Sequence, residues 1–233
     1  MGLEDFFELC KRWLKSNKFN HVVTLNPEMI MLAERDNIFR SAVRAAEIRV
    51  PDGAGLVWAR WYLRSGYWPL LPSLLTFLWQ KVERVTGVDA VMILSRLCQR
   101  MGKSIYLLGG TSQQRQETAN KLKRRFPELA VTAGSQSVKE FQPAVLLVAY
   151  GAPKQTVWIE EQRKNLPSVR IAMGVGGAFA MISEDLPRAP RWLRTLNIEW
   201  LWRLYLEPGR WPRIWQATVR FPLLMRKQKK LLL

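Results

Sequence analysis

The chain has 233 residues, 48% of them hydrophobic, which excludes a disordered protein and allows a sizeable buried core. No apolar segment reaches the roughly 18 to 20 residues of a membrane-spanning helix, and two cysteines indicate no disulfide or metal framework. The net charge of +17 predicts a phosphate-bearing partner, whether nucleic acid, lipid headgroup or anionic substrate. The N-terminus reads as an amphipathic helix rather than a signal peptide, so we expect reduced thiols and a cytosolic protein.

Strand and helix signals alternate through the first 187 residues. Asn26 is expected to cap a helix that begins with Pro27, and a polar helix is expected over 112–126. Apolar runs predict strands at 21–25, 46–50, 104–108, 144–150 and 170–173. Continuous apolar runs are typical of parallel strands buried on both faces. The sequence therefore predicts an α/β fold built on a mainly parallel sheet with flanking helices.

Two regions break this alternation. Residues 58–80 are rich in Trp, Leu and Pro, and they fit either a buried helical excursion or an apolar patch that touches a membrane or a lipid-linked substrate. Helices with basic faces are expected after Pro187, where 11 Lys and Arg face two Glu between 188 and 230, together with five tryptophans. We therefore expect an α/β domain over 1–187 and a basic, Trp-rich appendage over 188–233 that lies on a membrane.

Glycines follow several of the predicted strands, at the edge where α/β sheets bind ligands. Gly109-Gly110-Thr111 and the run 174–177 allow close backbone approach, and a helix N-terminus favours phosphate. We interpret these turns as a cradle for an anionic, nucleotide-like ligand, although Gly-Gly turns also serve plain geometry. Neither a dinucleotide fingerprint nor a P-loop is present.

The candidate for chemistry is Asp52, a carboxylate between Pro51 and Gly53 at the end of a predicted strand. Such a carboxylate acts either as a general base or as an ordinary turn residue. The lone histidine, His21, begins a strand and is interpreted as structural. Because there is no Asp-x-Asp motif or His/Asp cluster, we expect no divalent metal.

Seven motifs then combine into a known pattern: TLNPEMI (24–30), VPDGAGLVWA (50–59), ERVTGVD (83–89), IYLLGGT (105–111), YGAPKQ (150–155), GVGGAF (174–179) and RAPRWLRTLNIEWLWRLYLEPGRWPR (188–213). In this order they resemble the WecG/TagA/CpsF family of bacterial glycosyltransferases, and they span nearly the whole chain. The resemblance implies a Rossmann-like fold of the GT-E type with a C-terminal helical appendage that docks on the membrane.

The resemblance also implies a reaction. Family members transfer a sugar, such as N-acetylmannosamine, its uronic acid or glucuronic acid, from a UDP-sugar to a polyprenyl-diphosphate-linked saccharide. The transfer inverts the anomeric centre, needs no metal or cofactor, and occurs at the cytoplasmic face of the membrane during cell-envelope polysaccharide synthesis. The implied partners are therefore both substrates and an anionic membrane surface, not nucleic acid, and oligomerisation stays open.

By the same resemblance, Asp52 matches the base that deprotonates the acceptor hydroxyl. The implied substrate-binding residues are Thr24, Asn26, Arg84, Gly109, Gly110, Thr111, Gln155, Gly176 and Gly177. The implied arginines of the appendage, which close over the active site and offset the charge of the leaving diphosphate, are Arg203, Arg210 and Arg213. Each arginine has the alternative of being solvated or of binding lipid.

The chain departs from the family pattern in four places, of which the first two, Ala180 and Thr156, bear on contacts with the donor. Ala180 stands where Asp is usual, Thr156 stands where Glu is common, the stretch 134–144 is short, and 60–80 is expanded. Two other functions therefore stay open. Charge and tryptophans also fit a basic nucleic-acid-binding protein, and Ala180 also fits an inactive, membrane-docked scaffold of the same fold.

Overall fold

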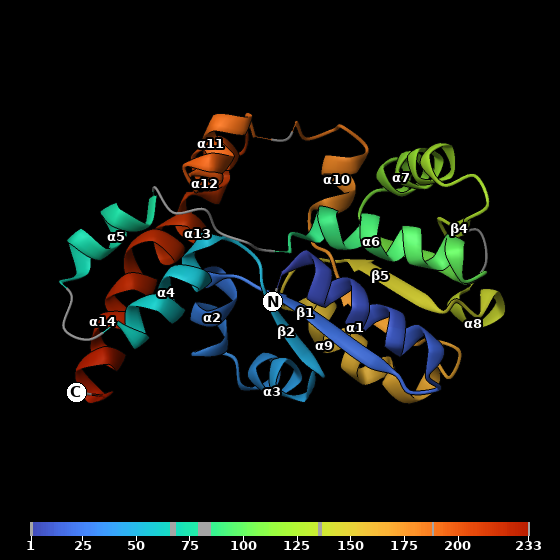
Figure 1. Ribbon diagram of the computed structural model, residues 1–233, viewed down its shortest axis with the longest axis horizontal. Helices are drawn as coiled ribbons and strands as arrows, with labels where there is room; N and C mark the ends of the chain where they lie inside the picture. Colours follow the sequence, from blue (N-terminus) through green and yellow to red (C-terminus); the bar gives the residue numbers. More distant parts are fainter. Residues whose placement is uncertain (1, 66–68, 79–84, 135–136, 188, 233) are drawn as a thin grey trace. The chain divides into compact units, whose positions relative to one another are not determined.

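The computed structural model describes residues 2–65, 69–78, 85–134, 137–187 and 189–232 (Figure 1). The chain divides into two compact units, each assembled from separate stretches of sequence. Unit 1 comprises residues 1–24, 37–50 and 85–187, and unit 2 comprises residues 25–36, 51–84 and 188–233. Each unit is described by itself below.

A six-stranded sheet of order β2-β1-β6-β5-β3-β4 organises unit 1. The strands are β1 (Asn20–Leu25), β2 (Ile48–Pro51), β3 (Ser104–Gly109), β4 (Ala130–Thr132), β5 (Val145–Ala149) and β6 (Ile171–Gly174). The pairs β1–β6, β6–β5, β5–β3 and β3–β4 are parallel, so these strands end at one edge. The predicted mainly parallel α/β fold is thus confirmed.

Alternate side chains of the central strands enter two different cores. Leu107, Leu147 and Met173 belong to the larger core, whereas Leu146 and Ala172 belong to a second core on the opposite face. The helices of unit 1 are α1 (Leu3–Lys15), α3 (Asn37–Ala45), α6 (Gly87–Arg100), α7 (Ser112–Arg125), α8 (Val138–Phe141), α9 (Lys154–Gln162) and α10 (Ala178–Ile182), with a 3-10 turn η1 (Arg163–Asn165). Burial on both faces explains the continuous apolar run of β5.

Unit 2 is helical and has its own core. Its helices are α2 (Pro27–Ala33), α4 (Ala54–Arg64), α5 (Leu70–Leu78), α11 (Arg191–Thr195), α12 (Glu199–Leu206), α13 (Trp211–Trp215) and α14 (Phe221–Leu232), with a 3-10 turn η2 (Pro208–Arg210) and a π-helical turn η3 (Gln216–Arg220). Trp58 and Tyr62 of α4 stack and pack against Phe221 of α14. The buried Lys229 also donates to the carbonyls of Tyr62 and Ser65, 2.8 and 2.7 Å away, which holds α14 to the end of α4 (Figure 1).

The described part of the region 58–80 is buried in one helix and exposed in the other, and its contact with a membrane or lipid-linked substrate stays a prediction. Trp58 and Tyr62 are buried, whereas Leu71 and Leu75 of α5 are 72% and 63% exposed. Helices were expected after Pro187 and are present. The short strand β4 and the helix α3 were not predicted. The passage from unit 1 to unit 2 after Pro187 coincides with the expected boundary, but unit 2 also includes 25–36 and 51–84; the division into a catalytic domain and an appendage stays a prediction.

Candidate functional site

The turn that follows β3 requires glycine for two reasons. Gly109 and Gly110 have φ of +85° and +65°, the left-handed region that favours glycine. A Cβ on Gly109 would lie 2.7 Å from the carbonyl carbon of Ala149, inside any normal contact distance. The N–H of Gly110 donates to the Ala149 carbonyl oxygen at 3.0 Å. The glycines therefore let the ends of β3 and β5 lie in close contact.

Arg115 supports this turn from α7, and the sequence analysis missed it. Its Nη1 donates to the carbonyl oxygens of Gly109 and Gly110 at 3.1 and 3.0 Å, and its Nε donates to Ala133 at 3.2 Å. The one sequence signal for this role is the spacing between Arg115 and the turn. Arg115 lies four residues after the N-cap Thr111, and helical side chains tilt toward the N-terminus, so it faces back toward the glycines. The guanidinium adds positive charge directly beside the expected nucleotide cradle.

Thr111 serves as the N-cap of α7. Its Oγ1 accepts the N–H of Gln114 at 3.1 Å, and the Gln114 side chain accepts the N–H of Thr111 at 3.3 Å. This reciprocal capping box satisfies two backbone N–H groups at the start of α7 and holds the loop that carries Gly110. Thr111 therefore caps α7, while a contact between Thr111 and a ligand stays a prediction.

Gln155 joins the loops that follow β5 and β6. Its buried Oε1 accepts the N–H of Gly151 at 3.1 Å and the N–H of Gly176 at 3.2 Å. A Cβ on Gly174 would lie 2.6 Å from the Gln155 Nε2, so the amide fills the space that glycine leaves. Thr24 Oγ1 donates to the Gly174 carbonyl oxygen at 3.0 Å. These contacts bring together Thr24, Gln155 and Gly176. Gly177 comes next in the chain and is the N-cap residue of α10.

Asp52 and Asn26 lie close together in unit 2. The N–H of Asp52 donates to the carbonyl oxygen of Leu25 at 2.6 Å, immediately before Asn26. Asn26 Oδ1 accepts the N–H of Met29 at 2.9 Å, which confirms its predicted capping role. A Cβ on Gly55 would lie 2.7 Å from Pro27 Cγ, so α4 and α2 approach closely there. Asp52 is half-buried between the end of β2 and the start of α4.

Two of the predicted arginines, Arg203 and Arg210, meet at one carboxylate in unit 2. Nε and Nη2 of Arg203 lie 3.1 and 3.0 Å from Glu207 Oε2, and Nη1 of Arg210 lies 3.4 Å from the same oxygen. Nη2 of Arg210 lies 4.0 Å from Glu28 Oε1, on the first turn of α2 beside Asn26. Burial and the adjacent charge of Arg210 lower the pKa of Arg203, although Glu207 opposes that shift. Nothing in the sequence pattern singled out Glu207.

The remaining predicted residues stand apart from these contacts. Arg213 is exposed on α13, and Arg84 lies outside the described residues. Of the departures from the family pattern, Thr156 is 1% exposed on α9, and Ala180 lies within α10, where its carbonyl oxygen accepts the N–H of Leu186. The Thr156 side chain is therefore part of the interior of unit 1.

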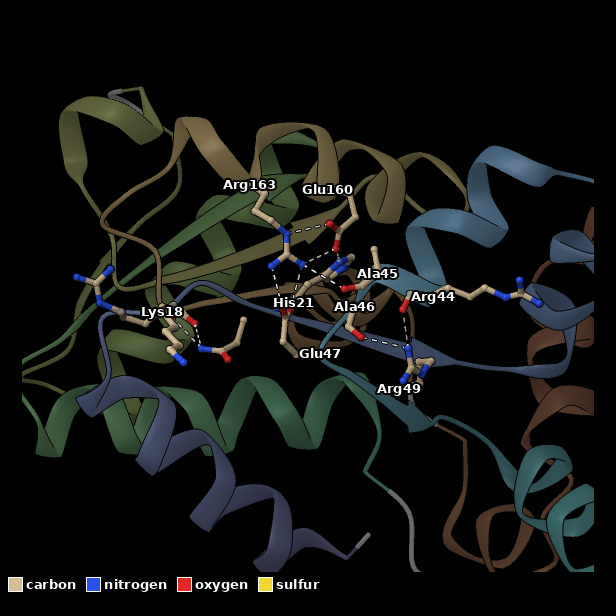
Figure 2. A network of polar contacts seen from close by, with 11 residues as sticks. Lys18, His21, Arg44, Ala45, Ala46, Glu47, Arg49, Glu160 and Arg163 are labelled. Carbon is tan, nitrogen blue, oxygen red and sulfur yellow. Dashed lines mark hydrogen bonds and ion pairs between the residues drawn. The ribbon is translucent and has the colours of Figure 1, made fainter.

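His21 belongs to a buried polar network at the opposite, amino-terminal end of β1 (Figure 2). Its Nδ1 lies 2.5 Å from Glu160 Oε1, and Arg163 donates to both Glu160 and Glu47. Glu47 in turn accepts the backbone N–H of His21 at 2.6 Å. Burial opposes ionisation of Glu160, but the hydrogen bonds from His21 and Arg163 outweigh it and lower its pKa to about 2. The network joins β1 to the residue before β2, to α9 and to η1, as the structural interpretation of His21 predicts.

Exposed apolar side chains gather in unit 2. Among the described residues, ten of the twelve large exposed ones belong to it, namely Leu71, Leu75, Trp192, Trp200, Leu201, Tyr205, Trp211, Trp215, Leu223 and Leu231. Within the ranges that the structure describes, no helix is long and apolar enough to cross a bilayer, and no group of three or more His, Cys, Asp or Glu side chains could hold a metal ion.

Comparison with known proteins identifies the relatives of this chain. Over 241 residues it is 25% identical to the N-acetylglucosaminyldiphosphoundecaprenol N-acetyl-beta-D-mannosaminyltransferase of Bacillus subtilis (strain 168), covering 98% of this chain and 88% of that protein. It is 27% identical over 213 residues to the protein of the same name from Bacillus spizizenii, covering 87% and 77%. The family model of the WecG/TagA/CpsF glycosyl transferases matches residues 1–232. The chain therefore belongs to the WecG/TagA/CpsF family of glycosyl transferases.

Proposed function

We propose that this protein transfers a sugar from a UDP-sugar to a polyprenyl-diphosphate-linked saccharide during cell-envelope polysaccharide synthesis. N-acetylmannosamine is the sugar we expect, and an N-acetylglucosaminyl-diphosphoundecaprenol the acceptor, because both occur in the names of the two Bacillus relatives. The observation that carries the proposal is the half-buried Asp52, held on its turn beside Asn26 in a chain that matches the family throughout.

In the proposed reaction the acceptor hydroxyl oxygen attacks the anomeric carbon while its proton passes to the Asp52 carboxylate. The bond between the anomeric carbon and the UDP oxygen breaks, and UDP leaves with the electron pair. A single displacement of this kind inverts the anomeric centre and needs one base. Arg203 and Arg210, with Arg213 joining them, stabilise the charge that develops on the diphosphate, the role a metal ion has elsewhere.

The turns at Gly109-Gly110-Thr111 and Gly176-Gly177 would bind the nucleotide. Support comes from the positive φ of three of these glycines and from the guanidinium of Arg115 beside the first turn. Thr24, Asn26, Arg84 and Gln155 would complete the polar surroundings of the substrates. For Gln155 the contribution is indirect, because its carbonyl oxygen is used to hold Gly151 and Gly176.

We further propose that unit 2 docks peripherally on the inner face of the cell membrane. Exposed tryptophans suit the depth of lipid headgroups, and the 11 Lys and Arg between 188 and 230 would attract anionic lipid. The competing reading as a nucleic-acid-binding protein leaves the glycine turns and the Asp52 turn without a role, and the family match does not favour it.

The decisive experiment measures UDP release from a panel of UDP-sugars with a polyprenyl-diphosphate-GlcNAc acceptor, for the parent and for Asp52→Asn. We expect acceptor-dependent release with one donor and a loss of roughly 100-fold or more in the variant, the usual contribution of a general base. Equal rates would remove Asp52 as the base. The absence of release with every donor from a protein that still binds UDP would favour the inactive scaffold.

A further inference from the structure

One carboxylate oxygen, Glu207 Oε2, lies between the two arginines to which the proposed function assigns the leaving diphosphate. Three guanidinium nitrogens lie 3.0 to 3.4 Å from it, two from Arg203 and one from Arg210. A single oxygen that faces several N–H groups of two arginines is also how proteins bind a phosphate oxygen. The two guanidinium groups thus form an anion site, and Glu207 occupies it.

Two carboxylates lie near these two arginines, and they differ in how they contact them. Glu207 lies within hydrogen-bond distance of both arginines, whereas Glu28 lies 4.0 Å from Arg210 and contributes its charge without a hydrogen bond. Burial lowers the pKa of Arg203 and the charge of Arg210 lowers it further, whereas Glu207 and Glu28 oppose this shift. An incoming group with two or more negative charges would satisfy this cluster better than the single charge of Glu207.

From these contacts we propose that Glu207 is an internal competitor for the diphosphate, occupying its place between Arg203 and Arg210 until UDP or a UDP-sugar displaces it. The inference rests on the proposed function, since it assumes that these arginines meet the diphosphate. It assigns Glu207 a positioning role rather than contact with the reacting atoms. In the absence of substrate, the negative charge of Glu207 offsets the repulsion between the two guanidinium groups. When substrate binds, the diphosphate replaces the Glu207 carboxylate.

Displacement of Glu207 requires little change in the chain. The contacts are local ones, at spacings of four and three residues, and the Glu207 side chain is 37% exposed. Pairs of this kind contribute little to stability. The backbone is held independently, because the N–H of Glu207 donates to the Arg203 carbonyl and the N–H of Arg210 donates to the Glu207 carbonyl, each at 3.0 Å. A rotation of the Glu207 side chain would therefore release both guanidinium groups without moving the backbone that positions them.

The test is calorimetric titration of the full chain with UDP and, separately, with uridine. Glu207→Gln keeps the shape of the side chain and removes its charge, so we expect UDP to bind roughly two- to fivefold more tightly, as the loss of a weak competing pair implies. Uridine lacks the diphosphate, and its affinity should not change. The matched control is Glu34→Gln, which removes one exposed carboxylate from the same unit and should leave UDP affinity near that of the parent.

Two further variants connect the effect to the arginines. Arg203→Gln should weaken UDP binding, and adding Glu207→Gln to it should restore less affinity than Glu207→Gln gains in the parent. If Arg203→Gln weakens UDP binding while Glu207→Gln also weakens it or leaves it unchanged, Glu207 is no competitor, although the arginine role survives. If neither change affects UDP binding, the arginines do not meet the diphosphate and the inference falls, whereas continued sugar transfer by the parent would preserve the proposed reaction.

Discussion

The two units of this chain differ in the kind of chemical group that their candidate residues provide. In unit 1 the candidate groups belong mainly to the backbone. They are glycine turns with positive φ, held by hydrogen bonds from Gln155 and Arg115 at the ends of a sheet buried on both faces. In unit 2 the candidate groups belong to side chains, namely Asp52, the arginines around Glu207 and the exposed tryptophans. Among the described residues, unit 1 exposes only Leu3 and Ile38 of its large apolar side chains.

This difference indicates how each unit should respond to mutation. A site made of main chain depends on close backbone contacts, so substitutions there act mainly through stability. A site made of side chains on short helices depends on charge and on apolar area, so substitutions there should change activity or binding and leave folding intact. Each of the following predictions would break or sharpen this contrast.

The largest effect is expected at Arg203 in unit 2. Removing one group that stabilises a developing anion usually lowers the catalytic rate by about 100-fold or more, so Arg203→Gln should lower sugar transfer by that amount. Arg203→Lys should recover only part of the rate, because an ammonium group lacks the planar fork of a guanidinium. Arg220→Gln removes an exposed arginine from the same region and serves as the control. If Arg203→Gln lowered the unfolding midpoint as well as the activity, the contrast between the two units would be contradicted.

Gly109 tests the main-chain site of unit 1. Gly109→Ala places a Cβ 2.7 Å from the Ala149 carbonyl carbon at a φ of +85°, so we expect the free energy of unfolding to fall by about 3 kcal/mol. Gly102 also has a positive φ, +59°, but a Cβ there meets nothing within 4 Å, and Gly102→Ala should cost only about 1 kcal/mol. Urea unfolding measures both variants. Equal losses would mean that the close contact with β5 is unimportant.

The exposed tryptophans of unit 2 should govern membrane binding. Trp211 and Trp215, whose ring centroids lie 5.7 Å apart, are 53% and 45% exposed. Replacing both with Ser should weaken binding to anionic vesicles by about tenfold in a flotation assay, and added salt should weaken it further. The matched change in unit 1, Leu3→Ser with Ile38→Ser, should have no effect. From the apolar sequence of 58–80 we also expect Trp68→Ser with Trp79→Ser to weaken vesicle binding; both residues lie outside the described ranges.

The smallest effect concerns acid stability and the network of His21 in unit 1 (Figure 2). The pKa of Glu160 is about 2 in the folded protein against 4.5 for an unperturbed Glu, so the unfolded chain binds the proton more readily. The stabilisation is complete above about pH 4.5 and is lost as the pH falls toward 2. Unfolding of the parent between pH 5 and 3 should show this slope, and Glu160→Gln should flatten it. An unchanged slope would remove Glu160 as its source.

Much of unit 1 could be predicted from local sequence. The apolar run that forms β5 and the glycines after β3 each encode their own geometry, as does the Asn26 cap before Pro27 in unit 2. The strand β4 was missed because three residues, Ala130–Thr132, are too short a run for periodicity to be visible. Arg115 was missed because an arginine on a polar helix shows its purpose only when the carbonyls it binds are known.

By itself the sequence determined the family, the α/β alternation, the candidate residues and the basic, Trp-rich end of the chain, because these depend on composition and on neighbours along the chain. Only the tertiary structure decided that 25–36, 51–84 and 188–233 form one unit, and that Arg210 lies 4.0 Å from Glu28 of α2. It also decided that Trp58 is buried while Leu71 is exposed. The physical reason is that burial and charge pairing depend on which helices pack together, and similar apolar and basic helices give no local sign of their partner.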